Sequence, residues 1–168
     1  MGGGYPNTEL RSLSDPRVFE VLDFISLDDG ERPLRNIIEH LAGKKSIEQL
    51  KRTFCLVNQK VQYVNGSTDV DISFHKTGTP DYSDLLLNDY LSVIEVTNSM
   101  HRLWSDGRWN KLTMAHGCYW KKCSFCDISL DYIKNYEPIS ATILCDRMET
   151  LINQTGVSGF HFVDEAAP

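Results

Sequence analysis

Residues 109–127 read WNKLTMAHGCYWKKCSFCD. The stretch from Trp109 to Ala115 predicts a strand, and it leads through His116 and Gly117 into a loop with three cysteines. After this loop, Ser140 precedes a helical repeat of apolar residues that ends at Gly156, and GFHFV over residues 159–163 predicts a strand. Strand, cysteine loop, helix and strand follow one another as in a β/α unit, whose two strands pair in parallel. The sequence therefore predicts an α/β fold with its cysteines at the carboxyl end of a strand.

The chain ahead of this unit predicts a second α/β piece joined to the first by a loop. Apolar spacing, capping residues and turn residues define its elements. The expected elements are a short helix from Ser14-Asp15-Pro16, a buried strand over 21–27, a helix from Glu31 to Gly43, a hairpin over 53–64 that turns at Asn58-Gln59-Lys60, a linker or surface loop over 65–90, and a helix over 97–104.

Composition narrows the class of protein. The chain has 168 residues, 41% of them hydrophobic and 24% charged, so burial can offset the chain entropy that folding costs. A net charge of −6 argues against a general nucleic-acid binder, which needs a basic face. No apolar run reaches the roughly 18–20 residues of a membrane span, and the N-terminus does not resemble a signal peptide. The sequence predicts a cytoplasmic protein without membrane contact.

The five cysteines are an odd number, which argues against a disulfide framework. Three of them follow the spacing Cys118-x4-Cys123-x2-Cys126, which indicates metal ligands. Thiolates suit both iron–sulfur clusters and zinc, and a structural zinc site usually has four protein ligands. Spacing alone thus leaves three interpretations: an iron–sulfur cluster, a zinc-stabilised module completed by His116 or Cys145, and no metal. Cys55 and Cys145 are predicted to be small buried hydrophobic residues.

The segment His116-Gly117-Cys118-Tyr119-Trp120-Lys121-Lys122-Cys123-Ser124-Phe125-Cys126-Asp127 resembles the cluster loop of radical S-adenosylmethionine (SAM) enzymes. The aromatic Phe125 directly before the last cysteine is similar to the family pattern. The family's usual gap between the first two cysteines is three residues, whereas this chain has four. The longer gap is tolerated in a sub-branch whose loop reads like GCYWKKCSFCD.

The N-terminal stretches GGGYPNTEL and VLDFISLDDGERPLRNIIEHL resemble the end of the Rossmann-like cobalamin-binding domain in one radical SAM class. The Asp-x-His-x-x-Gly motif that ligates cobalt from below does not occur in the sequence. The resemblance implies a fragment of a longer protein. Its parts would be the end of the Rossmann-like domain over 1–45, a hairpin and linker over 46–108, and the first β/α units of a partial TIM-type barrel over 109–168.

The resemblance implies that Cys118, Cys123 and Cys126 ligate a 4Fe–4S cluster whose open iron binds SAM. Reductive cleavage of SAM would give a 5′-deoxyadenosyl radical that acts on a small-molecule or peptide substrate. Phe125 would lie near the adenine, and Asp164 and Glu165 near the methionine ammonium; the alternative for these two carboxylates is a solvated strand end.

A flavodoxin or ferredoxin would supply the electron, and cobalamin would be a further cofactor of the class. The resemblance thus makes the parent protein a radical SAM enzyme, and we expect this fragment alone to be inactive.

Overall fold

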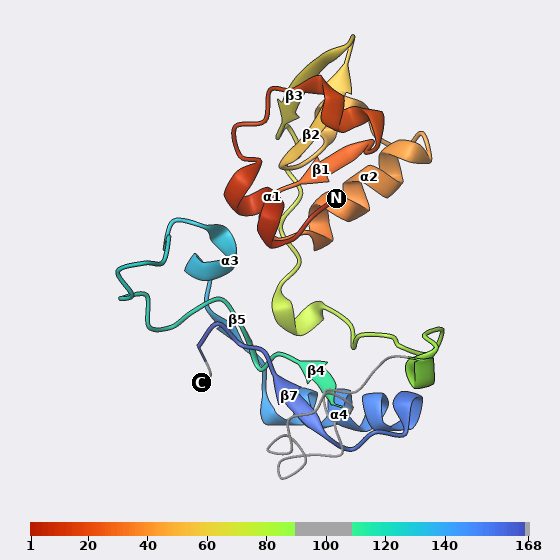
Figure 1. The fold of residues 1–168 in the computed structure, drawn as a ribbon, viewed down its shortest axis with the longest axis vertical. Coiled ribbons are helices and arrows are strands. Elements are labelled where there is room, and N and C mark those ends of the chain that lie inside the picture. Colours follow the sequence, from red (N-terminus) through yellow and green to blue (C-terminus); the bar gives the residue numbers. More distant parts are fainter. Residues whose placement is uncertain (90–108, 167–168) are drawn as a thin grey trace. The chain divides into compact units, whose positions relative to one another are not determined.

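A three-stranded antiparallel sheet in the order β1-β2-β3 is the centre of the N-terminal unit (Figure 1). The computed structural model describes residues 1–89 and 109–166. They divide into one unit of Met1–Ile72 with Asp127–Lys134 and another of Ser73–Cys126 with Asn135–Pro168. The elements of the first unit are α1 (Gly4–Glu9), η1 (Pro16–Glu20), β1 (Phe24–Ser26), α2 (Glu31–Leu41), η2 (Ile47–Gln49), β2 (Thr53–Val57), β3 (Lys60–Val64) and α3 (Asp131–Lys134).

Capping and turn residues in the sequence correctly predicted most helices and strands of this unit. The Asp15 side chain caps η1 by accepting from the Arg17 N–H, as the Ser-Asp-Pro pattern predicts. Gly43, with φ +71°, follows the end of α2. Asn58 and Gln59 both have positive φ, which gives the two-residue turn that suits the twist of a hairpin. The predicted strand and hairpin belong to one sheet, because β1 pairs antiparallel with β2.

Two strands of this sheet, β1 and β2, contribute side chains to the core of the first unit. Ile25, Leu27 and Phe54 are buried together, and residues from the preceding turns pack around them. Cys55 is buried as expected, and burial raises the pKa of its thiol. On α2 the predicted apolar face is largely exposed, at Leu34, Ile38 and Leu41, whereas Pro33 and Asn36 are buried.

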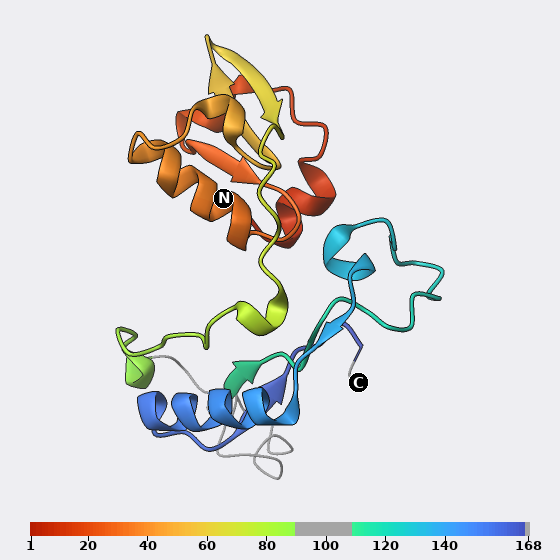
Figure 2. The ribbon, with the colours of Figure 1, turned by 180° about the vertical axis from the view of Figure 1, so that it is seen from behind.

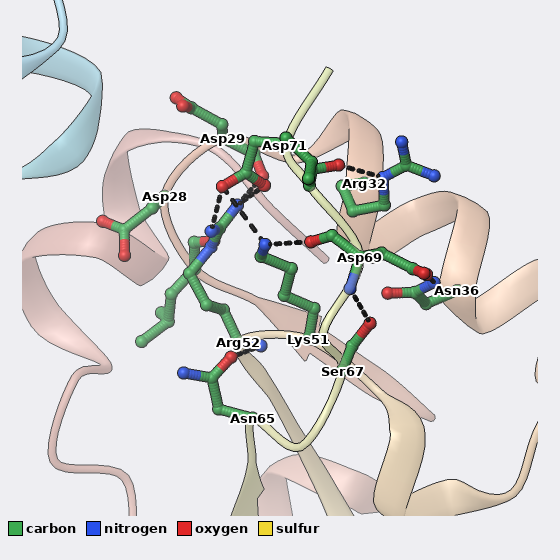
Figure 3. Close-up of polar contacts among 12 residues, drawn as sticks. Asp28, Asp29, Arg32, Asn36, Lys51, Arg52, Asn65, Ser67, Asp69 and Asp71 are labelled. Carbon is green, nitrogen blue, oxygen red and sulfur yellow. Dashed lines mark hydrogen bonds and ion pairs between the residues drawn. The ribbon is translucent and has the colours of Figure 1, made fainter. Parts of the chain in front are cut away.

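The chain after β3 is irregular, as predicted for residues 65–90, but its first part is anchored to the N-terminal unit (Figure 3). Arg52, which is only 7% exposed, binds both carboxylate oxygens of Asp71 at 2.8 and 2.9 Å. Lys51 Nζ donates to the backbone carbonyl of Asp69 at 2.6 Å. The Asp69 carboxylate accepts from Asn36 Nδ2 at 2.7 Å and pairs with Lys45. These bonds fix the path of residues 65–72.

We predict that acid weakens this anchorage. The Lys45 ammonium and the Asn36 amide lower the pKa of Asp69 to about 2. Because this pKa is depressed from about 3.9 in the unfolded chain, the carboxylate contributes stability above that value and loses it as pH falls through about 2. The difference in urea midpoint between the wild type and Asp69→Asn should therefore shrink between pH 4 and pH 2. Asp84→Asn, at an exposed carboxylate, is the control; a difference that stays constant with pH would contradict the prediction.

The second unit contains a parallel strand pair, β4 (Asn110–Leu112) with β7 (Phe160–Phe162), joined through α4 (Ala141–Thr155). Its other elements are β5 (Ala115–His116), β6 (Glu137–Pro138), η3 (Phe74–Lys76) and η4 (Leu87–Asp89). Ser140 caps α4 by accepting from the Ile143 N–H at 3.3 Å, and Gly156 ends it with φ +70°. Both views show α4 alongside the parallel pair (Figures 1 and 2). The predicted parallel β/α unit is therefore confirmed.

Two expectations about this unit are corrected. The strand predicted from Trp109 to Ala115 is two strands, since β4 ends at Leu112 and β5 pairs antiparallel with β6. Cys145 is exposed rather than buried, because it shares the exposed face of α4 with Glu149 and Ile152 at helical spacing. The helix predicted over 97–104 lies outside the described residues.

The mixed α/β class is confirmed. Within the described ranges, no helix is both long and apolar enough to cross a membrane.

Candidate functional site

The cysteine loop leaves the carboxyl end of the parallel pair. In that pair Leu112 is opposite Phe162, so the segment after β4 and the acidic residues after β7 emerge at the same edge. The bond from the Val163 N–H to the Leu112 carbonyl, 3.0 Å, extends the pairing one step further. Asp164 and Glu165 thus follow β7 at the edge from which the chain continues through β5 to the cysteine loop.

Among the described residues, none of the three clustered cysteines forms a disulfide. Cys118 is buried and follows Gly117, whose φ of +70° suits glycine. Cys123 and Cys126 are partly exposed at the two ends of a turn, closed by a 3.3 Å bond from the Cys126 N–H to the Cys123 carbonyl. Within residues 1–89 and 109–166, no three His, Cys, Asp or Glu side chains are gathered as a metal site requires. The donor type suits a soft metal centre, but the loop does not hold the thiols assembled around one.

Aromatic residues lie next to the cysteines in the sequence, and several of them are exposed. Phe125 is 90% exposed, on the turn between Cys123 and Cys126. The Tyr119 and Tyr136 rings meet edge to face with centroids 5.8 Å apart, and Lys122 Nζ lies 5.1 Å from the Trp120 ring centroid. The face of Phe125 is therefore open to a ligand from solvent.

The two carboxylates after β7 differ in environment. Asp164 Oδ1 accepts the backbone N–H groups of Met114 and Ala115, at 2.8 and 2.7 Å. Its other oxygen, Oδ2, is buried and has no hydrogen-bond partner within the described part of the chain. Glu165 is exposed. Asp164 is thus not a merely solvated strand end, since one of its oxygens holds the segment that leads to Cys118.

Glu137 is a polar residue of this region that the sequence did not reveal. Its Oε2 accepts the Phe74 N–H at 2.7 Å, and its Oε1 lies 2.8 Å from His75 Nδ1. Burial opposes ionisation of Glu137, but these two hydrogen bonds, together with electrostatic attraction from His75 and His116, hold the pKa of the carboxyl below its usual value. Glu137 is paired with His116 in the β5–β6 ladder, so the network reaches the residue that begins the HGC segment.

Arg147, also not singled out by its sequence, fixes the same segment to α4. It is 5% exposed, and its Nη2 donates to the carbonyls of Thr77 and Phe74 at 2.6 and 3.2 Å. Its guanidinium carbon lies 5.2 Å from the Phe74 ring centroid. Partners more than 60 positions apart could not be inferred from local pattern.

The first unit has an apolar hollow of about 400 Å³ beside the amino end of α2. Its wall includes Gly2, Leu34 and Ile37. The volume lies at the low end of the roughly 300–1,000 Å³ typical of ligand pockets.

No protein-family model matches the chain, and no curated protein sequence matches it either. Among solved structures, the chain is similar to the cobalamin-dependent S-adenosylmethionine radical enzyme OxsB with aqua-cobalamin and S-adenosylmethionine bound. That match has a TM-score of 0.63 and 14% identity over 98% of this chain. The same enzyme with aqua-cobalamin bound gives a TM-score of 0.59 and 14% identity over 92% of the chain. The chain spans about a fifth of that enzyme's length, so its fold corresponds to part of the larger structure.

Proposed function

We propose that the chain is the cluster-binding part of a radical SAM enzyme, together with the segment that precedes it. The observation that carries the proposal is the parallel β/α unit in which Cys118-x4-Cys123-x2-Cys126 follows β4, after the short strand β5. The fold likeness to part of an enzyme of this class, over almost the whole chain, supports it. The same fold likeness does not favour the zinc alternative.

Cys118, Cys123 and Cys126 would ligate a 4Fe–4S cluster through their thiolates. Bound there, the cluster supplies the electron for reductive cleavage of SAM to methionine and a 5′-deoxyadenosyl radical.

The remaining side chains of the site would bind and orient SAM. The buried Asp164 Oδ2 is a suitable acceptor for the methionine ammonium, because a charged donor would satisfy an oxygen that is otherwise unpaired. Glu165 adds a second negative charge at the same strand end. The open face of Phe125 would cover the adenine and exclude water from it.

The wider organisation follows from the same proposal. Residues 1–45 would be the end of a Rossmann-like domain, 46–108 a hairpin and linker, and 109–168 the first β/α units of a TIM-type barrel. The apolar hollow beside α2 is the candidate contact for part of a cobalamin. No Asp-x-His-x-x-Gly motif is present, so cobalt ligation from below is not part of the proposal. A flavodoxin or ferredoxin would donate the electron to the cluster.

Anaerobic reconstitution with iron and sulfide tests the proposal. We expect a brown protein with about four irons per chain, as a cubane cluster requires. Addition of SAM should change the EPR spectrum of the reduced cluster, because SAM binds the open iron. One zinc per purified chain with no iron uptake would instead support the zinc module. An EPR spectrum of the reduced cluster that does not change when SAM is added would contradict the radical SAM assignment.

A further inference from the structure

Asp164 binds the backbone where the strand pairing is interrupted, between β4 and the cysteine loop. The strand β4 ends at Leu112, and β5 begins at Ala115 with a different partner strand. At this junction the N–H groups of Met114 and Ala115 point to one acceptor, Asp164 Oδ1, at 2.8 and 2.7 Å. A backbone N–H without a hydrogen-bond partner at this junction would lower the stability of the fold. The Asp164 carboxylate provides an acceptor for two such N–H groups at once.

The junction is held from the other side as well. The Met114 carbonyl accepts from the Ile139 N–H at 3.0 Å, so both polar groups of Met114 are bonded. Asp164 itself is fixed, because the residue before it, Val163, is bonded to β4. Only His116 and Gly117 separate this clamped backbone from Cys118. A carboxylate 46 positions beyond Cys118 therefore bonds the backbone that leads to the buried thiol.

We propose that Asp164 is a positioning residue, which fixes the backbone from which Cys118 projects and so preorganises the first ligand of the cysteine loop. The role as a preorganised cluster ligand rests on the proposed function; the effect on Cys118 itself does not. One carboxylate oxygen holds the loop, and the buried Oδ2 remains for a ligand, so occupation of the SAM site and the order of the loop depend on the same side chain.

The test measures how fast Cys118 is alkylated in the full chain without metal, by mass spectrometry of its peptide. In Asp164→Ala both N–H groups lose their acceptor, and we expect Cys118 to be labelled about tenfold faster than in the wild type. Asp164→Asn keeps a carbonyl oxygen that accepts both bonds, so its labelling rate should stay near that of the wild type. Glu165→Ala is the matched control at the exposed neighbour, and Cys145, which is already exposed, is the internal control for reagent activity.

If Asp164→Ala left the alkylation rate of Cys118 unchanged, the proposal would be overturned. It would also be overturned if Asp164→Asn accelerated alkylation as much as Asp164→Ala does, because the negative charge of the carboxylate, and not its role as hydrogen-bond acceptor, would then protect Cys118. Hydrogen exchange over residues 141–155 checks that α4 stays folded. If Asp164→Ala loosens it, Asp164→Ser, whose shorter side chain does not reach both N–H groups, replaces it in the same comparison.

The proposed function fails separately from this inference. If the wild type takes up no iron, the cluster assignment is wrong, whereas the labelling rates still decide the role of Asp164. If the wild type loads a cluster, iron content adds a second readout: it should fall in Asp164→Ala and be restored in Asp164→Asn. Full iron content in Asp164→Ala with faster labelling of Cys118 would contradict preorganisation of the ligand.

Discussion

Simultaneous replacement of Cys118, Cys123 and Cys126 by alanine should lower iron loading from about four irons per chain to below about one. Thiolates are the ligands that hold such a cluster, and each cysteine would supply one iron with its only protein ligand. Iron and sulfide analysis of the reconstituted protein, with the EPR spectrum of the reduced sample, measures the effect. Circular dichroism should stay close to that of the wild type, since Cys123 and Cys126 lie on a loop and are partly exposed.

Cys145→Ala is the matched control for these variants. It removes one exposed thiol outside the loop, so its iron content should equal that of the wild type. Retention of about four irons by the triple variant would show that the loop does not hold the cluster. A large loss of iron in Cys145→Ala would show that the proposed ligand set is wrong.

Ile25→Ala should destabilise the N-terminal unit by about 2–5 kcal/mol, the range measured when a large aliphatic side chain is removed from a core. Ile25 has no exposed surface and lies in the central cluster with Leu27 and Phe54. Hydrogen exchange of the full chain reports this unit by itself, because peptides over 53–64 contain the paired strands β2 and β3. In Ile25→Ala the amides of these peptides should exchange about 100-fold faster than in the wild type.

Val21→Ala is the control for the core variant. It removes two methyl groups from a side chain that is 83% exposed, so exchange over residues 53–64 should change little. Equal protection in wild type and Ile25→Ala would mean that the small sheet does not depend on this core. Such a result would indicate that polar contacts such as the Arg52–Asp71 ion pair, and not this core, stabilise the unit.

The elements that the sequence predicted are those with local causes. Ser140 and Gly156 bracket α4 because a capping hydroxyl and a left-handed residue act within one turn of the helix. Asn58 and Gln59 turn the hairpin by their own backbone conformation. Two predictions were wrong: one unbroken strand from Trp109 to Ala115, and a buried Cys145. Strand partners and the orientation of a helix face depend on residues far along the chain, which a local pattern does not contain.

The sequence by itself determined the donor set of the candidate site. Three cysteines within nine residues are a chemical fact of the loop, and the cluster and SAM roles of Cys118, Cys123, Cys126, Phe125, Asp164 and Glu165 stay predictions. Only the tertiary structure brought Asp164 to the N–H groups of Met114 and Ala115, and Glu137 to Phe74 and His75. The physical reason is that a thiol carries its ligand chemistry wherever it lies, whereas a hydrogen bond exists only when folding brings donor and acceptor within about 3 Å of each other.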